Sequence, residues 1–84
     1  MEKKEMIINS LSGLEARSIA LLIQKAANYK SSIWIEKAER KANAKSLLGL
    51  LSLSIGNSEI IAISAEGEDE TTAVAELSNF INGL

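Results

Sequence analysis

Two spacings of apolar side chains divide the 84-residue chain into predicted strands and helices. Residues 32–36 alternate, which puts Ile33 and Ile35 on one face of a strand and Trp34 on the other. Other short apolar segments, the last of them rich in isoleucine, have the length of strands. These further predicted strands are 6–8, 41–44 and 59–66.

Apolar residues three and four positions apart predict the helices. The first helix carries Ala16, Ile19, Ala20, Ile23 and Ala27 on its apolar face, and the last carries Ala73, Leu77, Ile81 and Leu84. With a short leucine-rich helix between them, the predicted order is β-α-β-β-α-β-α. Because each amphipathic stripe needs a partner layer, we expect an α+β fold with the helices on one face of a small antiparallel sheet.

The turn between the second and third predicted strands reads Lys37-Ala38-Glu39-Arg40. It contains neither the Gly nor the Asn that tight two-residue hairpin turns favour. We therefore expect a longer or looser turn at this position.

Length and composition indicate one small domain over residues 1–84, with 46% apolar residues. A chain this short buries only roughly 60–65% of its unfolded surface, so we expect function on the surface and not in an internal cavity. No apolar run approaches the roughly 20 residues that cross a bilayer, so no membrane insertion is expected. The charged start, residues 1–5, leads into only three apolar residues, so we expect no signal peptide and a cytoplasmic location.

Composition also excludes several kinds of chemistry. The chain has no cysteine and no histidine, so it cannot build zinc sites, thiol nucleophiles or histidine-based triads, and no metal or other cofactor is expected. A net charge of −2 with interspersed signs argues against direct nucleic-acid binding. One dense acidic run is expected at the start of the last helix, where acids complement the helix dipole; it comprises Glu66, Glu68, Asp69 and Glu70.

A short motif before the first predicted helix reads Gly13-Leu14-Glu15-Ala16-Arg17. It resembles the active-site loop of HPr, the histidine-containing phosphocarrier of the bacterial sugar phosphotransferase system, which reads Gly-Leu-His-Ala-Arg-Pro. The resemblance puts Glu15 where that family carries its phosphoacceptor histidine, and Ser18 at the position of its proline. Two hallmark residues of the loop have thus changed together.

Two further segments resemble the same family. Residues 43–53, Asn-Ala-Lys-Ser-Leu-Leu-Gly-Leu-Leu-Ser-Leu, are similar to the regulatory helix of Gram-positive HPr proteins, in which the serine is a kinase target. Residues 63–70 are similar to the last strand and the turn into the last helix. The resemblance runs over essentially the whole chain without insertions. It implies an open-faced β-sandwich, a four-stranded antiparallel sheet covered on one face by three helices.

The carboxylate of Glu15 alters the chemistry of the motif. Imidazole accepts and passes on a phosphoryl group, whereas glutamate would have to form an acyl phosphate, so we expect no phosphorelay. One alternative is an exposed contact of Glu15 with Arg17 or with the helix dipole, of about 0–1 kcal/mol. The other is that its fixed negative charge partly imitates phosphohistidine.

Two cations lie near predicted helix starts, where the helix dipole disfavours them. Arg17 falls in the first turn of the first helix, and Lys45 lies just before the second. Free N–H groups at a helix start and an arginine fork together suit an anion such as phosphate. In the family the arginine of this motif steadies the phosphohistidine, and Arg17 matches it; the alternative is a solvated surface arginine.

Ser46 has two compatible predicted roles. A serine before a leucine-rich helical turn is a favoured N-cap, worth roughly 1 kcal/mol. The family resemblance adds regulatory phosphorylation, because the residues around Ser46 match the kinase target. A phosphate there would lie beside exposed N–H groups and Lys45.

Five leucines between positions 47 and 53 cannot all face inward on one short helix, so some should form an exposed docking patch. In HPr proteins this helix faces enzyme I, sugar-permease components, the kinase and the catabolite control repressor. The predicted partner-binding residues are Glu15, Arg17, Lys45, Ser46, Leu47, Leu48, Gly49 and Leu51.

The combination of a lost histidine and a retained serine resembles Crh, the catabolite-repression relative of HPr in bacilli, where the lost histidine is a glutamine. The resemblance implies a non-catalytic regulator that HPr kinase/phosphorylase modifies on Ser46 and that binds a LacI-type repressor as corepressor. The DNA would be contacted by the repressor. The alternatives are a phosphocarrier with an unconventional acceptor, and a decoy that occupies enzyme I or permease sites without transferring phosphate.

Overall fold

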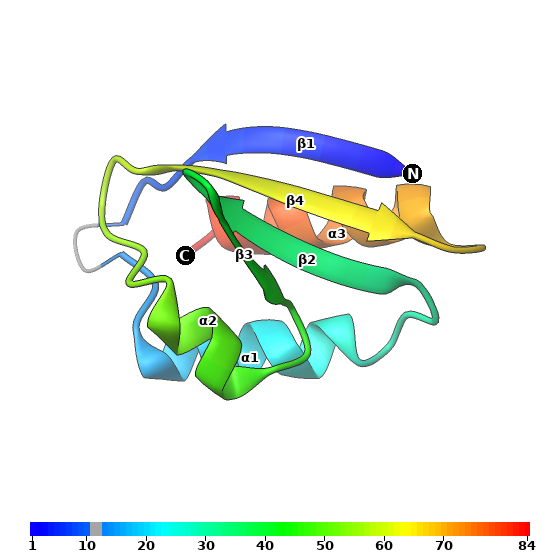
Figure 1. Cartoon of the computed structure of the whole chain (residues 1–84), viewed down its shortest axis with the longest axis horizontal. Helices are drawn as coiled ribbons and strands as arrows, with labels where there is room; N and C mark the ends of the chain where they lie inside the picture. The colour runs from blue at the N-terminus through cyan, green and yellow to red at the C-terminus, as the bar shows by residue number, and fades with distance from the viewer. Residues whose placement is uncertain (11–12) are drawn as a thin grey trace.

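The structure is a computed structural model that describes residues 1–10 and 13–84. Its elements follow the order predicted from the apolar spacings (Figure 1). They are β1 (Glu2–Ile7), α1 (Ala16–Ala26), β2 (Ser32–Lys37), β3 (Arg40–Asn43), α2 (Leu47–Ser52), β4 (Ile60–Glu66) and α3 (Glu70–Asn82).

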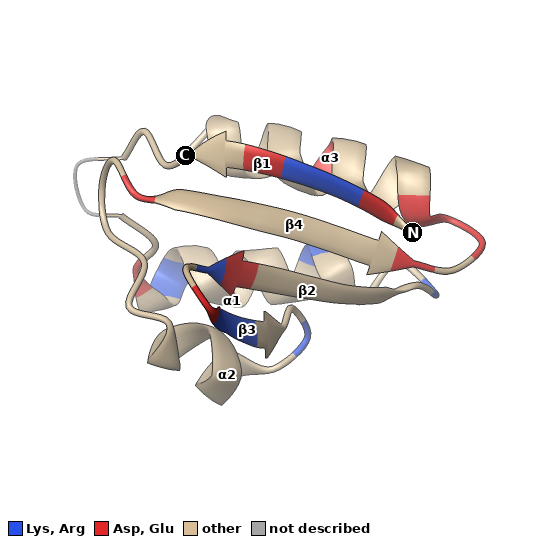
Figure 2. Ribbon diagram, turned by 45° about the horizontal axis from the view of Figure 1, so that its top comes forward, with Lys and Arg blue, Asp and Glu red and all other residues tan. Residues whose placement is uncertain are grey.

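One antiparallel sheet with the strand order β1-β4-β2-β3 forms one layer of the molecule. The three helices lie together on one side of this sheet, and the other face is left uncovered (Figures 1 and 2). The predicted α+β arrangement is confirmed. The described residues contain no helix that is long and apolar enough to cross a bilayer.

The core lies between the sheet and the helices. On β2 the alternation predicted from the sequence holds, because Ile33 and Ile35 are fully buried and Trp34 faces the other way. The neighbouring strand β4 contributes Ile61 and Ile63 to the same layer. The helices close the core with Ile19, Leu22, Ala26, Ala73, Val74, Leu77 and Ile81.

The buried face of α1 differs from the predicted one. Ile19 is buried as expected and Ile23 is partly buried, but the three alanines of the predicted face are exposed, and Leu22 and Ala26 are buried instead. The exposed alanines are Ala16, Ala20 and Ala27. The larger side chains decide the orientation, because burying a leucine removes far more apolar surface from water than burying an alanine. At the other end, Leu84 lies beyond the last residue of α3 and is 38% exposed.

The expectation of a longer turn between β2 and β3 is wrong. Lys37 and Arg40 are register partners, so only Ala38 and Glu39 connect the strands. Ala38 has φ = 54°, in the left-handed region that costs a non-glycine residue about 1–2 kcal/mol. The Lys37 ammonium holds the turn in place, because it donates to the carbonyls of Leu53 and Ser54 and pairs with Glu59 at 2.8 Å.

We predict that Ala38→Gly stabilises the protein by about 0.5–1 kcal/mol, since relief of the left-handed strain exceeds the extra freedom that glycine has in the unfolded chain. Urea unfolding would measure the change. Ala20→Gly, at an exposed position inside α1, is the matched control and should destabilise by about 1 kcal/mol. Destabilisation by both substitutions would show that Ala38 is not strained.

The turn between α1 and β2 is fastened to the start of α3. Asp69 accepts hydrogen bonds from the backbone N–H of Lys30 and of Ser31, at 2.9 and 3.0 Å, and from the Ser31 hydroxyl. These bonds, that of the Ser31 hydroxyl foremost, hold the pKa of Asp69 below its ordinary value. Asp69 is the N-cap residue of α3, yet its side chain makes no cap bond. This part of the acidic run therefore secures a distant turn, whereas Glu70 lies in the first turn of α3 as predicted.

Candidate functional site

The segment before α1 is shaped by close backbone packing. Gly13 has φ = +67°, and a Cβ there would lie 2.4 Å from the Ile55 carbonyl oxygen, so only glycine fits. Leu14 is buried, and its N–H donates to the same carbonyl at 3.0 Å. These contacts fix the point at which the chain turns into α1. They leave the next residue, Glu15, exposed at the surface.

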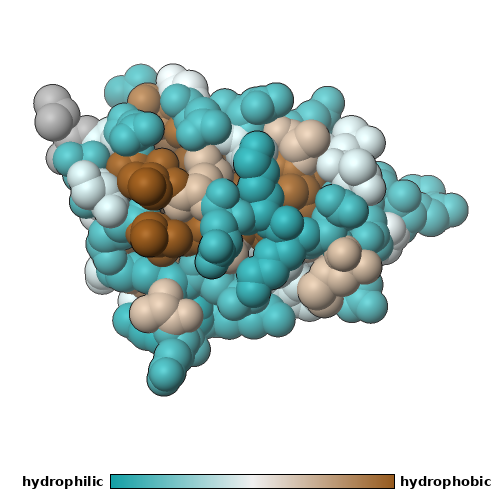
Figure 3. Space-filling model, turned by 90° about the horizontal axis from the view of Figure 1, so that it is seen from above, coloured by the Kyte–Doolittle hydropathy of each residue, from teal (hydrophilic) through white to brown (hydrophobic). Residues whose placement is uncertain are grey.

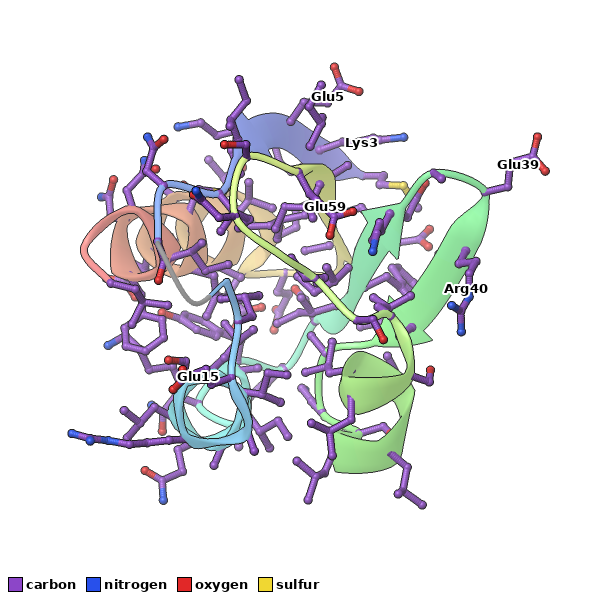
Figure 4. The ribbon with its side chains drawn as sticks, turned by 90° about the vertical axis from the view of Figure 1, so that its left-hand side faces the viewer. Lys3, Glu5, Glu15, Glu39, Arg40 and Glu59 are labelled. Atoms are coloured by element: carbon purple, nitrogen blue, oxygen red, sulfur yellow. The ribbon has the colours of Figure 1, made fainter. Side chains whose placement is uncertain are left out.

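Glu15 is the N-cap residue of α1 but does not cap it with its side chain. Its carbonyl accepts the Ile19 N–H at 2.9 Å, while its carboxylate makes no cap hydrogen bond. Figure 4 shows this side chain at the start of α1, on the side turned away from α2. The site thus presents an exposed carboxylate at the positive end of a helix dipole.

Arg17 lies in the first turn of α1 and is also exposed, as predicted. An acidic and a basic segment are therefore adjacent at this end of the helix (Figure 2). Within residues 1–10 and 13–84 the ion pairs are Met1–Glu70, Lys3–Glu36 and Lys37–Glu59, so Glu15 and Arg17 do not pair with each other. Both charges face solvent.

Ser46 begins α2 as its N-cap, which confirms the predicted capping role. Its backbone is extended, and its hydroxyl accepts the Gly49 N–H at 3.2 Å. Asn43 sets up this position from the preceding strand: its carbonyl accepts the Ser46 N–H at 3.0 Å and its side-chain oxygen the Lys45 N–H at 2.8 Å. A Cβ on Gly49 would stand 3.3 Å from the Ser46 hydroxyl, so glycine leaves that oxygen uncrowded.

The sequence suggested that Lys45 would face an anion site beside Ser46. In the structure its ammonium faces the turn that follows α1. Its ammonium donates to the carbonyl oxygens of Tyr29 and Ser31, at 2.8 and 3.1 Å. The lysine therefore ties the start of α2 to the turn that follows α1. These contacts span 16 and 14 positions of the chain, and no local motif signals them.

The leucines of α2 divide between core and surface, as predicted. Leu50 and Leu53 are buried, whereas Leu47, Leu48 and Leu51 are 47%, 80% and 39% exposed. Helix α1 runs beside α2 on the same side of the sheet (Figure 1). It adds the exposed Leu21, which sequence reasoning missed because it falls between the buried positions of the helical repeat.

The uncovered face of the sheet carries a separate surface, away from these residues. A hollow of about 550 Å³ lies there between β1, the β2–β3 turn and the start of β4, and its walls include Lys3, Glu5, Lys37 and Glu59 (Figures 3 and 4). Its carboxylates do not gather into a metal site, since the described part of the chain holds no cluster of three or more residues able to bind a metal ion.

The strand order, the helices on one face of the sheet and the serine that starts a leucine-rich helix are together the features of an HPr-like protein. The family model for the PTS HPr component phosphorylation site matches residues 2–83. The chain belongs to the HPr family. Proteins of this family are phosphocarriers and related HPr-like proteins, and they are not themselves enzymes.

Relatives of both kinds occur at similar distances. The chain is 43% identical to the HPr-like protein Crh of Halalkalibacterium halodurans over 81 residues, 96% of each chain. It is 40% identical to phosphocarrier protein HPr of Borreliella burgdorferi over 84 residues, 100% of this chain and 98% of the relative. The crystal structure of HPr-C-His from Thermoanaerobacter tengcongensis matches with a TM-score of 0.93 at 38% identity, covering 100% of this chain and 98% of that one.

We predict that Ser46→Ala lowers the free energy of unfolding by about 1 kcal/mol, because α2 loses its N-cap and the Gly49 N–H loses its hydrogen-bond acceptor. Ser46→Asp should recover most of this loss, since aspartate is an equally good N-cap. Urea unfolding measures both changes, and Ser32→Ala, at an exposed position that starts β2, is the control. Equal stability of Ser46→Ala and the parent would contradict the capping role.

Proposed function

We propose that this protein is a regulator of carbon catabolite repression that is phosphorylated on Ser46 and then binds a LacI-type repressor. It would act in the cytoplasm and would not relay phosphate through a histidine. One observation carries the proposal: the chain contains no histidine, yet it keeps a serine at the start of an exposed leucine-rich helix.

Phosphorylation would occur at the Ser46 Oγ. An HPr kinase/phosphorylase would transfer the γ-phosphoryl group of ATP to this oxygen, forming the new P–O bond as the bond to ADP breaks, and a base of the kinase would take the hydroxyl proton. The Gly49 N–H donates to the oxygen and leaves the hydroxyl proton available for removal. The uncrowded space beside Gly49 supports access to the serine.

Glu15 supports a regulatory role and not a relay. In HPr-type relay the acceptor nitrogen gains and loses a phosphoryl group, whereas a carboxylate would form an acyl phosphate in a different geometry. The Glu15 carboxylate is exposed and unpaired with Arg17, so it offers a constant negative charge to a partner. We infer that this charge partly imitates the phosphorylated state of a carrier.

The proposed docking surface would extend from α2 to the start of α1, where the Glu15 side chain marks its far edge because it is turned away from α2. It would present an apolar centre with a charged rim, the composition usual for protein interfaces. Besides the kinase and the repressor, enzyme I and sugar-permease components are candidate partners. The residues proposed to contact partners are Glu15, Arg17, Lys45, Ser46, Leu47, Leu48, Gly49 and Leu51.

A phosphocarrier role is the second candidate, and the Borreliella relative favours it. That protein is named a phosphocarrier and is 40% identical over the full length of this chain. A carrier function would require an acceptor other than histidine, with Glu15 the candidate. A decoy that binds the same components without transfer would use the same surface.

Two phosphorylation reactions separate these functions. We predict that HPr kinase and ATP add one phosphate, which intact mass detects and Ser46→Ala abolishes. Phosphoenolpyruvate with enzyme I should add none, and Glu15→Gln is the matched control for that reaction. Phosphate acquired only from enzyme I, and lost in Glu15→Gln, would overturn the regulator and establish the carrier. Phosphate from neither source would leave the decoy.

A further inference from the structure

The side chain of Lys45 connects the modification site to a turn on another part of the molecule. The Lys45 ammonium donates hydrogen bonds to the Tyr29 and Ser31 carbonyls, and Lys45 directly precedes Ser46 in the chain. Lysine carries a compact charge on a flexible four-carbon stem, so its head group is able to change partner without backbone movement.

The turn at residues 28–31 is held from two sides. On one side the Asp69 carboxylate, at the start of α3, accepts hydrogen bonds from the N–H groups of Lys30 and Ser31 and from the Ser31 hydroxyl. On the other side the Lys45 ammonium donates hydrogen bonds to the carbonyl oxygens of Tyr29 and Ser31. Loss of the Lys45 contacts would therefore loosen the turn while Asp69 still kept it attached.

A phosphate on Ser46 would compete with these carbonyls for the lysine. Phosphoserine carries about −1.5 to −2 charges at neutral pH, and a hydrogen bond between two ions is roughly twice as strong as one between neutral groups. Lys45 and Ser46 are consecutive residues, and rotation about the flexible four-carbon stem of the lysine is what would bring its ammonium to the phosphate. The Tyr29 carbonyl is in an exposed setting where water is able to replace the lysine, which limits the cost of the exchange.

We propose that phosphorylation of Ser46 draws Lys45 away from the Tyr29 and Ser31 carbonyls, so that the modification is transmitted to the turn between α1 and β2. This inference rests on the proposed function, because it takes Ser46 as the modified residue. The phosphorylated protein then differs from the unmodified one at two surfaces: the start of α2 and the released turn.

The test uses the full chain with phosphoserine encoded at position 46 during synthesis, so it does not depend on recognition by a kinase. We predict that the ¹³C carbonyl resonances of Tyr29 and Ser31 shift on phosphorylation. Amide exchange at Lys30 and Ser31, whose N–H groups donate to Asp69, should accelerate by roughly three- to tenfold because the turn around them opens more easily. In the unmodified protein, Lys45→Met should shift the same carbonyl resonances in the same direction.

Further variants make the assignment specific to Lys45. With Lys45→Met in place, phosphoserine should cause no further change at the turn, and the second pKa of the phosphate should be higher than with lysine present. Lys41→Met is the charge-matched control, because the Lys41 ammonium lies over the Trp34 ring, 4.5 Å from its centroid, and not at the turn. It should leave the Tyr29 and Ser31 carbonyl resonances unchanged.

Two results would overturn the proposal. Carbonyl resonances and exchange rates that stay the same with encoded phosphoserine would mean that Lys45 remains at the turn. If Lys45→Met leaves the Tyr29 and Ser31 carbonyl resonances of the unmodified protein unchanged, the lysine does not hold the turn at all. Failure of a kinase to modify Ser46 would count against the proposed function alone, since the encoded phosphate tests the response of Lys45 directly.

Discussion

The hydrogen bond from the Gly49 N–H to the Ser46 hydroxyl decides where α2 begins, and the rest of the surface follows from that point. Because the helix starts at Leu47, its turn directs Leu50 into the core and leaves Leu47, Leu48 and Leu51 outside. A helix of six residues gains little from its own backbone bonds, so the cap and the buried leucines must hold it. The Ser46 oxygen that caps the helix is also the one proposed to accept phosphate. The same atom would therefore affect both the stability of α2 and its regulation.

The second constraint is chemical. Without histidine or cysteine, the chain has hydroxyl and carboxyl groups as its candidate phosphate acceptors, and the carboxyl group at position 15 is suited to bearing charge more than to passing phosphate on. The start of α1 is nevertheless built tightly, with Gly13 packed against the Ile55 carbonyl and Arg17 in the first helical turn. In our proposal the protein therefore keeps the surface that binds the partners of HPr phosphocarriers, but it does not transfer a phosphoryl group to them.

The sequence predicted the elements that depend on local spacing, such as the Ile33–Ile35 face and the Ser46 cap. It failed where contacts between distant residues decide the outcome. The turn at Ala38 is tight because Lys37 is bound to the carbonyls of Leu53 and Ser54, which no local turn rule contains. For the same reason the carbonyl partners of Lys45 could not be predicted, and the role of Asp69 at Ser31 appears only once α3 is placed beside the turn.

The central claim is that a phosphate on Ser46 creates the binding-competent form. Its most direct test is the affinity of a LacI-type catabolite repressor for the protein with and without encoded phosphoserine at position 46, measured by titration calorimetry at fixed salt. Our account predicts binding at least roughly tenfold tighter with the phosphate, a difference of about 1.4 kcal/mol. Equal affinity of the two forms, or binding only by the unmodified protein, would contradict it.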